Sequence, residues 1–384
     1  MPGKSPKIAV IGAGMGGLAV AATLRGIGCD VTVYEQAQRF TRIGAGIQML
    51  PNSSHVLRGL GILDKLRTIS FEPYSHLNRV WDTGEIKREL PMPESLHGAP
   101  FLCMHRADLH EALCSILPEE IIHLNKKLVG LDQKQGQVTM SFADGTTATA
   151  DAVVGADGVH SVVRSLIIGP DAPLHKGRIA YRAVFDASLM NGEIRPSRTK
   201  WWGEDRHIVI YYTRKDRSEV YFVTSVPEPA DWMTAESWSS KGDVKELREA
   251  YAGFHSEVQM VLNACPDCHK WAILEREPLP RWSDDKVVLL GDSCHPMTPY
   301  MAQGAATSIE DAAVLARCIQ HYGNDDLLGA FRLYEANRKP RTSRIQAISS
   351  ANTWMKGGND DTSWLYGYDA WHVPLVETEQ KRAS

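Results

Sequence analysis

The stretch KIAVIGAGMGGLAVAATLRGIGCDVTVYEQ, residues 7–36, decides the fold. It opens with a short apolar, β-branched run, which is typical of a strand buried on both faces. A glycine-rich turn, an Ala/Leu-rich helix to about Gly26 and a second strand from Asp30 to Tyr34 follow. Glu35 closes the unit. This order is that of a dinucleotide-binding strand–helix–strand unit, so we expect a bound dinucleotide.

Each glycine of the turn has a separate task in such a unit. Gly12 allows the tight turn, and Gly14 lets the backbone approach a pyrophosphate at the helix N-terminus. Gly17 lets the helix pack closely on the strand, and Glu35 can accept a hydrogen bond from a ribose hydroxyl. A plain glycine-rich turn is the alternative. The stretch by itself does not choose between NAD and FAD.

Length and composition bound the class of protein. The 384 residues are 43% hydrophobic and 23% charged, with a net charge of -4. The length favours two closely joined domains of ~150 residues or more each. The charge balance gives no reason to expect nucleic acid or an anionic membrane as a partner. No apolar run reaches the ~18 residues of a membrane helix, and the N-terminus enters the first strand directly. We therefore expect a cytoplasmic protein.

The cysteines predict a reduced compartment rather than a disulfide framework. Their number is seven, which is odd, and they are scattered along the chain. Cys265 and Cys268 form half of a metal or redox motif, but no second pair stands at a zinc-like spacing. A surface turn is the favoured interpretation, and no metal site is predicted.

Two further motifs place an acid at the end of a buried strand. Gly155-Ala-Asp157-Gly158 follows residues 152–154, and Gly291-Asp292 follows residues 287–290. A loop from residue 293 to Ala305 then leads into a long helix. Ligands bind at the carboxyl ends of strands in parallel α/β sheets. Both acids are therefore candidate ligands of the same dinucleotide.

Between these motifs the sequence changes character. Residues 179–282 hold strand-like runs that are crowded with aromatic side chains and indicate a mostly antiparallel sheet: Trp201, Trp202, Tyr211, Tyr212, Tyr221, Phe222 and Trp232. We predict an α/β protein in which a Rossmann-type domain (1–75, 100–178 and 283–345) interleaves with this substrate-binding sheet domain (76–99 and 179–282). Residues 346–384 form a C-terminal segment that we expect to be helical at first and to fray.

In order and spacing, the three glycine–acid motifs resemble those of the group A flavoprotein monooxygenases, the para-hydroxybenzoate hydroxylase type. The resemblance covers nearly the whole chain, and the segment GDSCHPMTPYMAQGA, residues 291–305, is its most specific part. It implies the para-hydroxybenzoate hydroxylase fold with FAD as cofactor. The implied FAD-binding residues are Gly12, Gly14, Gly17, Glu35, Gln36, Arg42, Gly46, Arg106, Asp157, Asp292, Gln303, Gly304 and Ala305.

Several of these residues take specific positions by resemblance. Arg106 would lie beside the ribityl-phosphate stretch, and Asp292 would contact the ribityl chain or the pyrophosphate. The backbone amides of residues 303–305 would face the isoalloxazine. Asp157 is associated with both FAD and NAD(P)H. The alternatives are a helix-start salt bridge with Asp108 for Arg106 and a turn position for Asp157.

The resemblance also implies the reaction. NAD(P)H reduces FAD, O2 adds to form a C4a-hydroperoxide, and an electron-rich ring takes one oxygen atom. The chain has no second GxGxxG motif, so NAD(P)H is expected to bind only transiently. The substrate expected is a small hydroxylated aromatic or N-heteroaromatic carboxylate such as 6-hydroxynicotinate or a hydroxypicolinate, or a salicylate-like phenol.

The stretch KWWGEDRHIVIYYT, residues 200–213, resembles the substrate sheet of one member of that family. There a His and a Tyr contribute to the pocket, and here they fall on His207 and Tyr211. On a strand these two residues share a face. We take both as candidate catalytic residues, His207 as the base in preference to His295. A structural, hydrogen-bonded histidine is the alternative.

The predicted substrate pocket also includes Gln48, Pro299 and Tyr300. That family member carries histidines at the positions of Gln48 and Tyr300, and a cysteine just upstream of Lys200 that this chain lacks. Glutamine does not titrate near neutral pH, and tyrosine titrates near ~10. These differences leave the identity of the ring open.

Two other classes of function stay open at this stage. One is an NAD(P)-dependent dehydrogenase that uses the first motif alone, and the other is a non-enzymatic nucleotide-sensing protein. A homodimer is compatible with the sequence.

Overall fold

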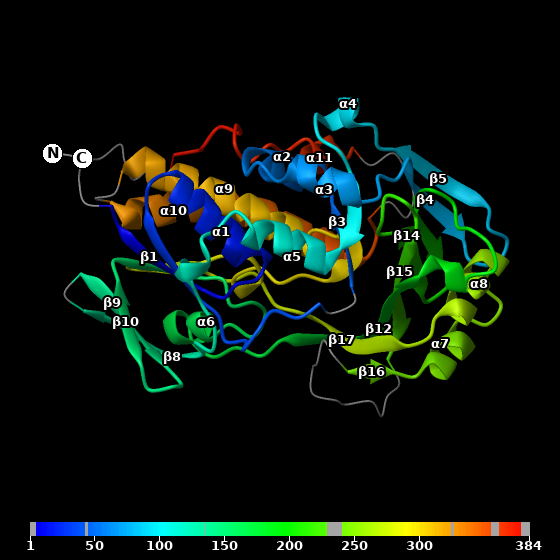
Figure 1. Cartoon of the computed structure of the whole chain (residues 1–384), viewed down its shortest axis with the longest axis horizontal. Helices are drawn as coiled ribbons and strands as arrows, with labels where there is room; N and C mark the ends of the chain where they lie inside the picture. Colours follow the sequence, from blue (N-terminus) through cyan, green and yellow to red (C-terminus); the bar gives the residue numbers. More distant parts are fainter. Residues whose placement is uncertain are drawn as a thin grey trace.

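A computed structural model describes residues 5–42, 45–134, 136–228, 240–323, 326–354 and 361–377. Helices α1 (Met15–Gly26), α9 (Gly304–Tyr322) and α10 (Leu327–Ala351) lie together at one end of the molecule. A large sheet stands at the other end (Figure 1). None of the helices in the described part of the chain has the length and apolar character that a membrane crossing requires.

A six-stranded sheet underlies α1 and α9 and has the order β18-β19-β11-β1-β2-β7. Every neighbouring pair is parallel except β18–β19. Parallel pairing brings the carboxyl ends of β1, β11 and β19 to one edge, and each of the three glycine–acid motifs follows one of these strands. The strands are β1 (Lys7–Ile11), β2 (Asp30–Tyr34), β7 (Ile122–His123), β11 (Ala152–Gly155), β18 (Ser283–Asp284) and β19 (Val287–Leu289).

An eight-stranded sheet, with the order β16-β17-β12-β15-β14-β13-β4-β5, forms the other end of the molecule (Figure 1). All of its pairs are antiparallel except β13–β4. Its strands are β4 (Ser75–Val80), β5 (Ile86–Pro91), β12 (Leu174–Asp186), β13 (Arg198–Trp202), β14 (His207–Tyr212), β15 (Glu219–Pro227), β16 (Lys241–Gly242) and β17 (Cys268–Glu275).

Smaller elements complete the fold. Strands β3 (Gly46–Met49) and β6 (Leu102–His105) pair with each other, and β8 (Leu128–Lys134), β9 (Gln137–Phe142) and β10 (Thr147–Ala150) form a three-stranded sheet. The remaining helices are α2 (Pro51–Gly59), α3 (Leu63–Ile69), α4 (Glu94–His97), α5 (Arg106–Cys114), α6 (Val162–Ile167), α7 (Val244–Ala250), α8 (Ser256–Ala264) and α11 (Ser363–Tyr366). Short 3-10 turns are η1 (Glu119–Ile121), η2 (Ala187–Leu189), η3 (Gly291–Ser293) and η4 (Pro299–Met301).

Three of the expected segment limits fall inside single elements. The limit between residues 75 and 76 lies within β4, which begins at Ser75. The limit between residues 178 and 179 lies within β12, which begins at Leu174. The limit between residues 345 and 346 lies within α10, which continues to Ala351 through Pro340. Long elements cross from one part of the molecule to the other, so composition alone did not mark their ends.

The expectation that the C-terminal tail frays is wrong for residues 361–377. Leu365, Tyr366 and Ala370 are buried there. The Arg317 guanidinium donates to the carbonyl oxygens of Ala370 and Val373 at 2.8 and 2.7 Å. Apolar burial together with charge-assisted bonds to backbone carbonyls holds the tail against the helices. Residues 355–360 and 378–384 of the tail, and Trp232, lie outside the described residues.

The expected surface turn at the cysteine pair is correct only for its middle. Pro266 and Asp267 are exposed, whereas Cys265 and Cys268 are buried between α8 and β17. All seven cysteines are free thiols. Desolvation raises the pKa of Cys268 to about 11, so its thiol is protonated and inert at neutral pH.

Candidate active site

The turn after β1 leaves no room for side chains at two of its glycines. A Cβ added to Gly12, whose φ is +102°, would lie 2.4 Å from the Ala156 carbonyl oxygen. A Cβ on Gly17 would lie 2.0 Å from the Gly12 carbonyl oxygen. These two glycines therefore let α1, β1 and the β11 turn approach one another, as the sequence predicts for a nucleotide-binding turn.

Gly14 is different because a Cβ there would meet nothing within 4 Å. It is the N-cap of α1, and no side chain caps that helix. The N-terminus of α1 therefore has no side-chain cap and has open space at Gly14, which is compatible with a bound pyrophosphate. Glu35 borders the same turn, and its carboxylate accepts the N–H groups of Ala13 and Ala37 at 2.7 and 2.8 Å.

The Asp157 carboxylate stabilises the turn that follows β11. One carboxylate oxygen accepts the N–H groups of Val162 and Val163 at 2.7 and 3.1 Å. The other accepts the hydroxyls of Ser161 and, at 3.3 Å, Ser293. The acid thus ties the turn after β11 to the turn after β19. This geometry matches the turn position that was the alternative for Asp157, and a role toward a cofactor stays a prediction.

Asp292 and Arg106 lie together in a cleft. Both side chains are open to solvent. Desolvation nevertheless raises the pKa of Asp292, and desolvation lowers the pKa of Arg106 while Asp292 opposes that shift. Side chains that are both accessible and desolvated line a concave space within the protein. A Cβ on Gly304 would lie 3.7 Å from Asp292 Oδ1, so the start of α9 borders the same space.

The proposed helix-start salt bridge of Arg106 with Asp108 is not present. Asp108 pairs instead with Arg42 at 2.7 Å and with Arg214 at 3.0 Å. Arg42, which the sequence places among the cofactor ligands, is therefore held on Asp108. Gly46 packs against the other sheet, because its Cβ would lie 2.5 Å from the Tyr221 ring. Gln36 is an exposed residue just beyond β2.

Gln303 is the N-cap residue of α9, and its side chain is fixed by α2. Asn52 Nδ2 donates to Gln303 Oε1 at 2.9 Å and to Glu310 Oε1 at 2.6 Å. Glu310 in turn pairs with Arg338 at 2.6 Å and with Arg341 at 2.9 Å. Within the described residues, the buried Gln303 Nε2 has no hydrogen-bond partner. An unpaired buried donor beside an uncapped helix N-terminus fits a cofactor with acceptor atoms at this edge.

His295 belongs to the same interior network. Its Nε2 lies 2.6 Å from Asp311 Oδ2, and Arg338 Nε donates to Asp311 Oδ1 at 2.6 Å. His295 is 1% exposed. The buried ion pairs position the loop that starts at Gly291, and the preference for His207 over His295 as the base agrees with this geometry.

The eight-stranded sheet turns one face toward the nucleotide end. His207, Val209 and Tyr211 alternate on β14, opposite Ser225, Val223 and Tyr221 of β15. The His207 ring lies 5.3 Å from the Tyr300 ring and 5.2 Å from the Trp202 ring. The Tyr211 hydroxyl lies 2.9 Å from the position of a Cβ on Gly46. Both candidate catalytic side chains therefore face the loops that follow β2 and β19.

Two tyrosines of this region are protonated at neutral pH. Burial, with Tyr221 adding to it, raises the pKa of Tyr211 well above its usual value, and a Gln48 hydrogen bond opposes the shift. Burial raises the pKa of Tyr300, whose hydroxyl lies 3.0 Å from the Ser225 hydroxyl. Both are neutral hydrogen-bonding groups, and the role of His207 as the base stays a prediction.

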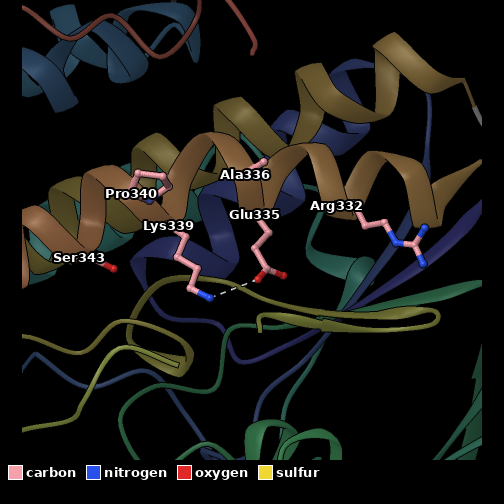
Figure 2. Close-up of a pocket in the computed structure, with 6 residues that line it drawn as sticks. All are labelled: Arg332, Glu335, Ala336, Lys339, Pro340 and Ser343. Carbon is pink, nitrogen blue, oxygen red and sulfur yellow. Dashed lines mark ion pairs between the residues drawn. The ribbon is translucent and has the colours of Figure 1, made fainter. Parts of the chain in front are cut away.

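A polar cavity of about 220 Å³ opens beside His207. Its lining residues come from the β13–β14 turn, from Arg178 and from the end of α10. Pro299 is the exposed first residue of η4, next to the buried Tyr300. A second, larger hollow of about 550 Å³ lies along the outer side of α10 between Arg332 and Ser343 (Figure 2). None of the predicted site residues lines that hollow, so it is not part of the candidate site.

Sequence reasoning missed two residues of this region. Asn52 carries no signal in the sequence, because its link to Gln303 spans 251 positions of the chain. Arg198 stands at the start of β13 and faces Tyr211, but the sequence alone does not distinguish a buried arginine from a surface one. The one available signal for Arg198 is its even spacing from Lys200 and Trp202 on a strand.

Comparison with known proteins supplies the family. The family model described as "FAD binding domain" matches residues 6–347. The chain is 44% identical to 6-hydroxynicotinate 3-monooxygenase of Pseudomonas fluorescens, over 99% of this chain and 100% of that protein. It is 36% identical to 3-amino-4-hydroxybenzoate 2-monooxygenase of Streptomyces cremeus, over 95% of each chain.

Solved structures agree with this result. HpxO of Klebsiella pneumoniae, complexed with FAD and uric acid, superimposes with a TM-score of 0.81 at 26% identity, over 92% of this chain and 90% of that chain. A salicylate hydroxylase substrate complex gives a TM-score of 0.79 at 25% identity, over 98% and 92%. The expected para-hydroxybenzoate hydroxylase fold and FAD are confirmed, in preference to a dehydrogenase that uses the first motif alone. The chain therefore belongs to the FAD-binding-domain family and is an FAD-dependent aromatic-ring monooxygenase.

Proposed function

We propose that the enzyme uses NAD(P)H and O2 to hydroxylate a small hydroxylated N-heteroaromatic carboxylate, such as 6-hydroxynicotinate or a hydroxypicolinate. The identity of 44% over the full length of a 6-hydroxynicotinate 3-monooxygenase supports this class of substrate. The observation that carries the proposal is the placement of His207 and Tyr211 on the one sheet face that looks toward Tyr300 and Gln48.

FAD would extend from the turn after β1 to the start of α9. Gly14 and the first turn of α1 would receive the pyrophosphate, and Glu35 would hold the adenosine ribose. Asp292 and Arg106 would line the middle of the cofactor, and each influences the pKa of the other. The uncapped N-terminus of α9 and the free Gln303 Nε2 would face the flavin ring. When bound, the flavin accepts a hydride from NAD(P)H and delivers one oxygen atom of O2 to the ring.

His207 would hold the proton of the substrate hydroxyl. An electron-rich ring reacts more readily when that hydroxyl is deprotonated, and imidazole is suited to proton transfer near neutral pH. Tyr211 and Tyr300 stay protonated because burial raises both pKa values. They would orient the ring as neutral hydrogen-bonding groups, while the surrounding apolar and aromatic side chains exclude water.

The choice between ring isomers depends on Gln48 and Tyr300. Both lack the imidazole that one relative carries at these positions, so the hydrogen-bonding pattern around the ring nitrogen differs from that relative. The test is a screen of hydroxynicotinates, hydroxypicolinates and hydroxybenzoates for NAD(P)H oxidation that depends on the aromatic compound, followed by identification of the product. Release of CO2 shows hydroxylation at the carbon that bears the carboxylate. If no compound of the panel stimulates NAD(P)H oxidation, the proposed substrate class is wrong.

A further inference from the structure

A buried arginine stands on the substrate face of the eight-stranded sheet, in line with Tyr211. Arg198 begins β13, and it pairs in register with His76 of parallel β4. On the other side of β13, Thr199 is paired with Ile210, which places Arg198 opposite Tyr211. Lys200 and Trp202 follow on the same face, since they alternate with Thr199 and Trp201. The face that carries the candidate base therefore also carries two long cationic side chains.

The surroundings of Arg198 contain no described anion. Arg198 is 4% exposed, and its Nη1 donates to Nε2 of His76. Its Nε has no partner in the described part of the chain. Desolvation lowers the pKa of Arg198 to about 10, and the groups that oppose this shift are Tyr366, Tyr211 and Cys103. None of these is a carboxylate.

Three other buried arginines of the protein are paired with carboxylates, namely Arg79, Arg164 and Arg338. Arg79 pairs with Glu257 at 2.7 Å, and Arg164 pairs with Asp171 at 3.0 Å. Arg338 pairs with both Glu310 and Asp311 at 2.6 Å. Among the described residues Arg198 makes no such pair. Burying a guanidinium is costly unless an anion compensates, so a ligand that brings an anion is the expected partner.

We propose that Arg198 binds the carboxylate of the aromatic substrate and so selects for it. The inference rests on the function proposed above, because it takes the substrate from that class. Arg198 and His207 stand at opposite ends of the β13–β14 pair, about 13 Å apart for four residues of strand. A ring with its carboxylate and hydroxyl at para positions reaches toward both groups. A ring with the two substituents at adjacent carbons does not.

The test compares two ligands and four proteins. Dissociation constants of 6-hydroxynicotinate and of the matching neutral carboxamide, 6-hydroxynicotinamide, are measured from the change in flavin absorbance of the holoenzyme, without NAD(P)H. The proteins are the wild type, Arg198→Gln, Arg198→Lys and the control Arg79→Gln. Arg79 is a buried arginine of the neighbouring strand β4, and it stacks on Trp201 at 4.1 Å on the opposite face of the sheet.

We expect the wild type to prefer the carboxylate over the carboxamide by roughly 10- to 100-fold, the range for a hydrogen-bonded charged pair. Arg198→Gln should remove this preference, Arg198→Lys should keep part of it, and Arg79→Gln should keep it fully. A merely structural arginine would change retention of FAD or the melting temperature without changing the ratio of the two dissociation constants. If Arg198→Gln does not retain FAD, Arg198→Met replaces it, because methionine fills similar space without a charge.

The outcomes separate the two proposals. If the wild type turns over an aromatic carboxylate and Arg198→Gln keeps the preference for it, Arg198 does not bind the carboxylate, although the proposed function stands. A third ligand, the analogue that lacks the ring hydroxyl, tests the other end of the ring. If Arg198→Gln keeps the preference for the carboxylate over the carboxamide but loses the preference for the ligand with the hydroxyl, Arg198 binds the hydroxyl end and the inference is wrong. If no aromatic carboxylate stimulates NAD(P)H oxidation by the wild type, the proposed function fails, and this inference fails with it.

Discussion

Asp292 and Gly304 lie side by side, although they are twelve residues apart: a Cβ on Gly304 would be 3.7 Å from Asp292 Oδ1. The acid that follows β19 therefore stands at the start of α9, and Arg106 is close enough to oppose the rise in the pKa of Asp292 that desolvation causes. This relationship joins the loop of the third glycine–acid motif to the helix whose N-terminus has no side-chain cap. We therefore propose that Asp292 and the start of α9 face the same bound cofactor.

Asp292→Ala should weaken FAD binding. The carboxylate is accessible in the cleft, and loss of a charged hydrogen-bond acceptor costs about 1–3 kcal/mol, or roughly 10- to 100-fold in the dissociation constant. The measurement is the flavin-to-protein ratio after gel filtration, with a titration of the apoprotein with FAD. The control is Asp284→Ala at the edge of the same sheet, where the carboxylate pairs with Arg281. A fully flavinylated Asp292→Ala protein would remove this residue from the cofactor site.

Gly14→Ala and Gly17→Ala should fail in different ways. A Cβ on Gly17 collides with the Gly12 carbonyl, so the fold should lose about 3 kcal/mol or more. A Cβ on Gly14 meets nothing in the protein and would instead occupy the space for the pyrophosphate. We expect Gly14→Ala apoprotein to melt at the wild-type temperature and to bind FAD about tenfold or more weakly. Equal FAD affinity in Gly14→Ala and wild type would place the pyrophosphate elsewhere.

His207→Gln should slow hydroxylation by about 10²- to 10⁴-fold, the range for loss of a general base, and should divert reducing equivalents to hydrogen peroxide. Retention of FAD should not change, because His207 lies on the other sheet. The measurement is the amount of product formed per NAD(P)H oxidised, which the variant should lower. His255→Asn is the control, since His255 stacks on Trp201 on the opposite face. Unchanged coupling and turnover in His207→Gln would exclude it as the base.

Acidification from pH 7 to 5 should destabilise the protein partly through His76. Burial, and then the charges of Arg198, Lys200 and Arg88, hold the pKa of His76 well below its usual 6.5. Below pH 6.5 the unfolded chain binds a proton at this position and the folded chain does not. His76 therefore does not lower the free energy of unfolding above pH 6.5. Below that pH it lowers the free energy of unfolding by up to about 1.4 kcal/mol per pH unit.

The check on His76 is the thermal midpoint of the FAD-saturated wild type and of His76→Asn at pH 7 and pH 5. The variant should lose less stability over this interval than the wild type does. The interval stays above the range in which the buried carboxylates Glu310 and Asp311 protonate, because their pKa values are lowered. An equal loss in both proteins would mean that His76 is protonated in the folded state.

The nucleotide end of the molecule could be predicted because its rules are local. Gly12 and Gly17 have to be glycine for steric reasons within one turn, and β1, α1 and β2 follow each other directly in the chain. The order of the three glycine–acid motifs then indicated the family. The sequence did not predict which side chains contact each other in the folded chain: Arg42 pairs with Asp108, and Asp157 accepts hydrogen bonds from its own turn.

The substrate end shows the same limit. The alternation of side chains on β14 predicts that His207 and Tyr211 share a face. The lack of a carboxylate beside Arg198 could not be predicted, because the strands around it come from separate parts of the chain. The docked tail was missed for a related reason. Its anchors come from distant parts of the chain, as in the bond from Arg317 to the Ala370 carbonyl, which spans 53 positions.

The most direct test of the central claim follows oxygen. The holoenzyme is supplied with NAD(P)H, isotopically labelled O2 and 6-hydroxynicotinate or a hydroxypicolinate, and the product is analysed by mass spectrometry. We expect one labelled oxygen atom in the ring product for each NAD(P)H oxidised. A product that carries no label, or NAD(P)H oxidation that no aromatic carboxylate stimulates, would contradict the account.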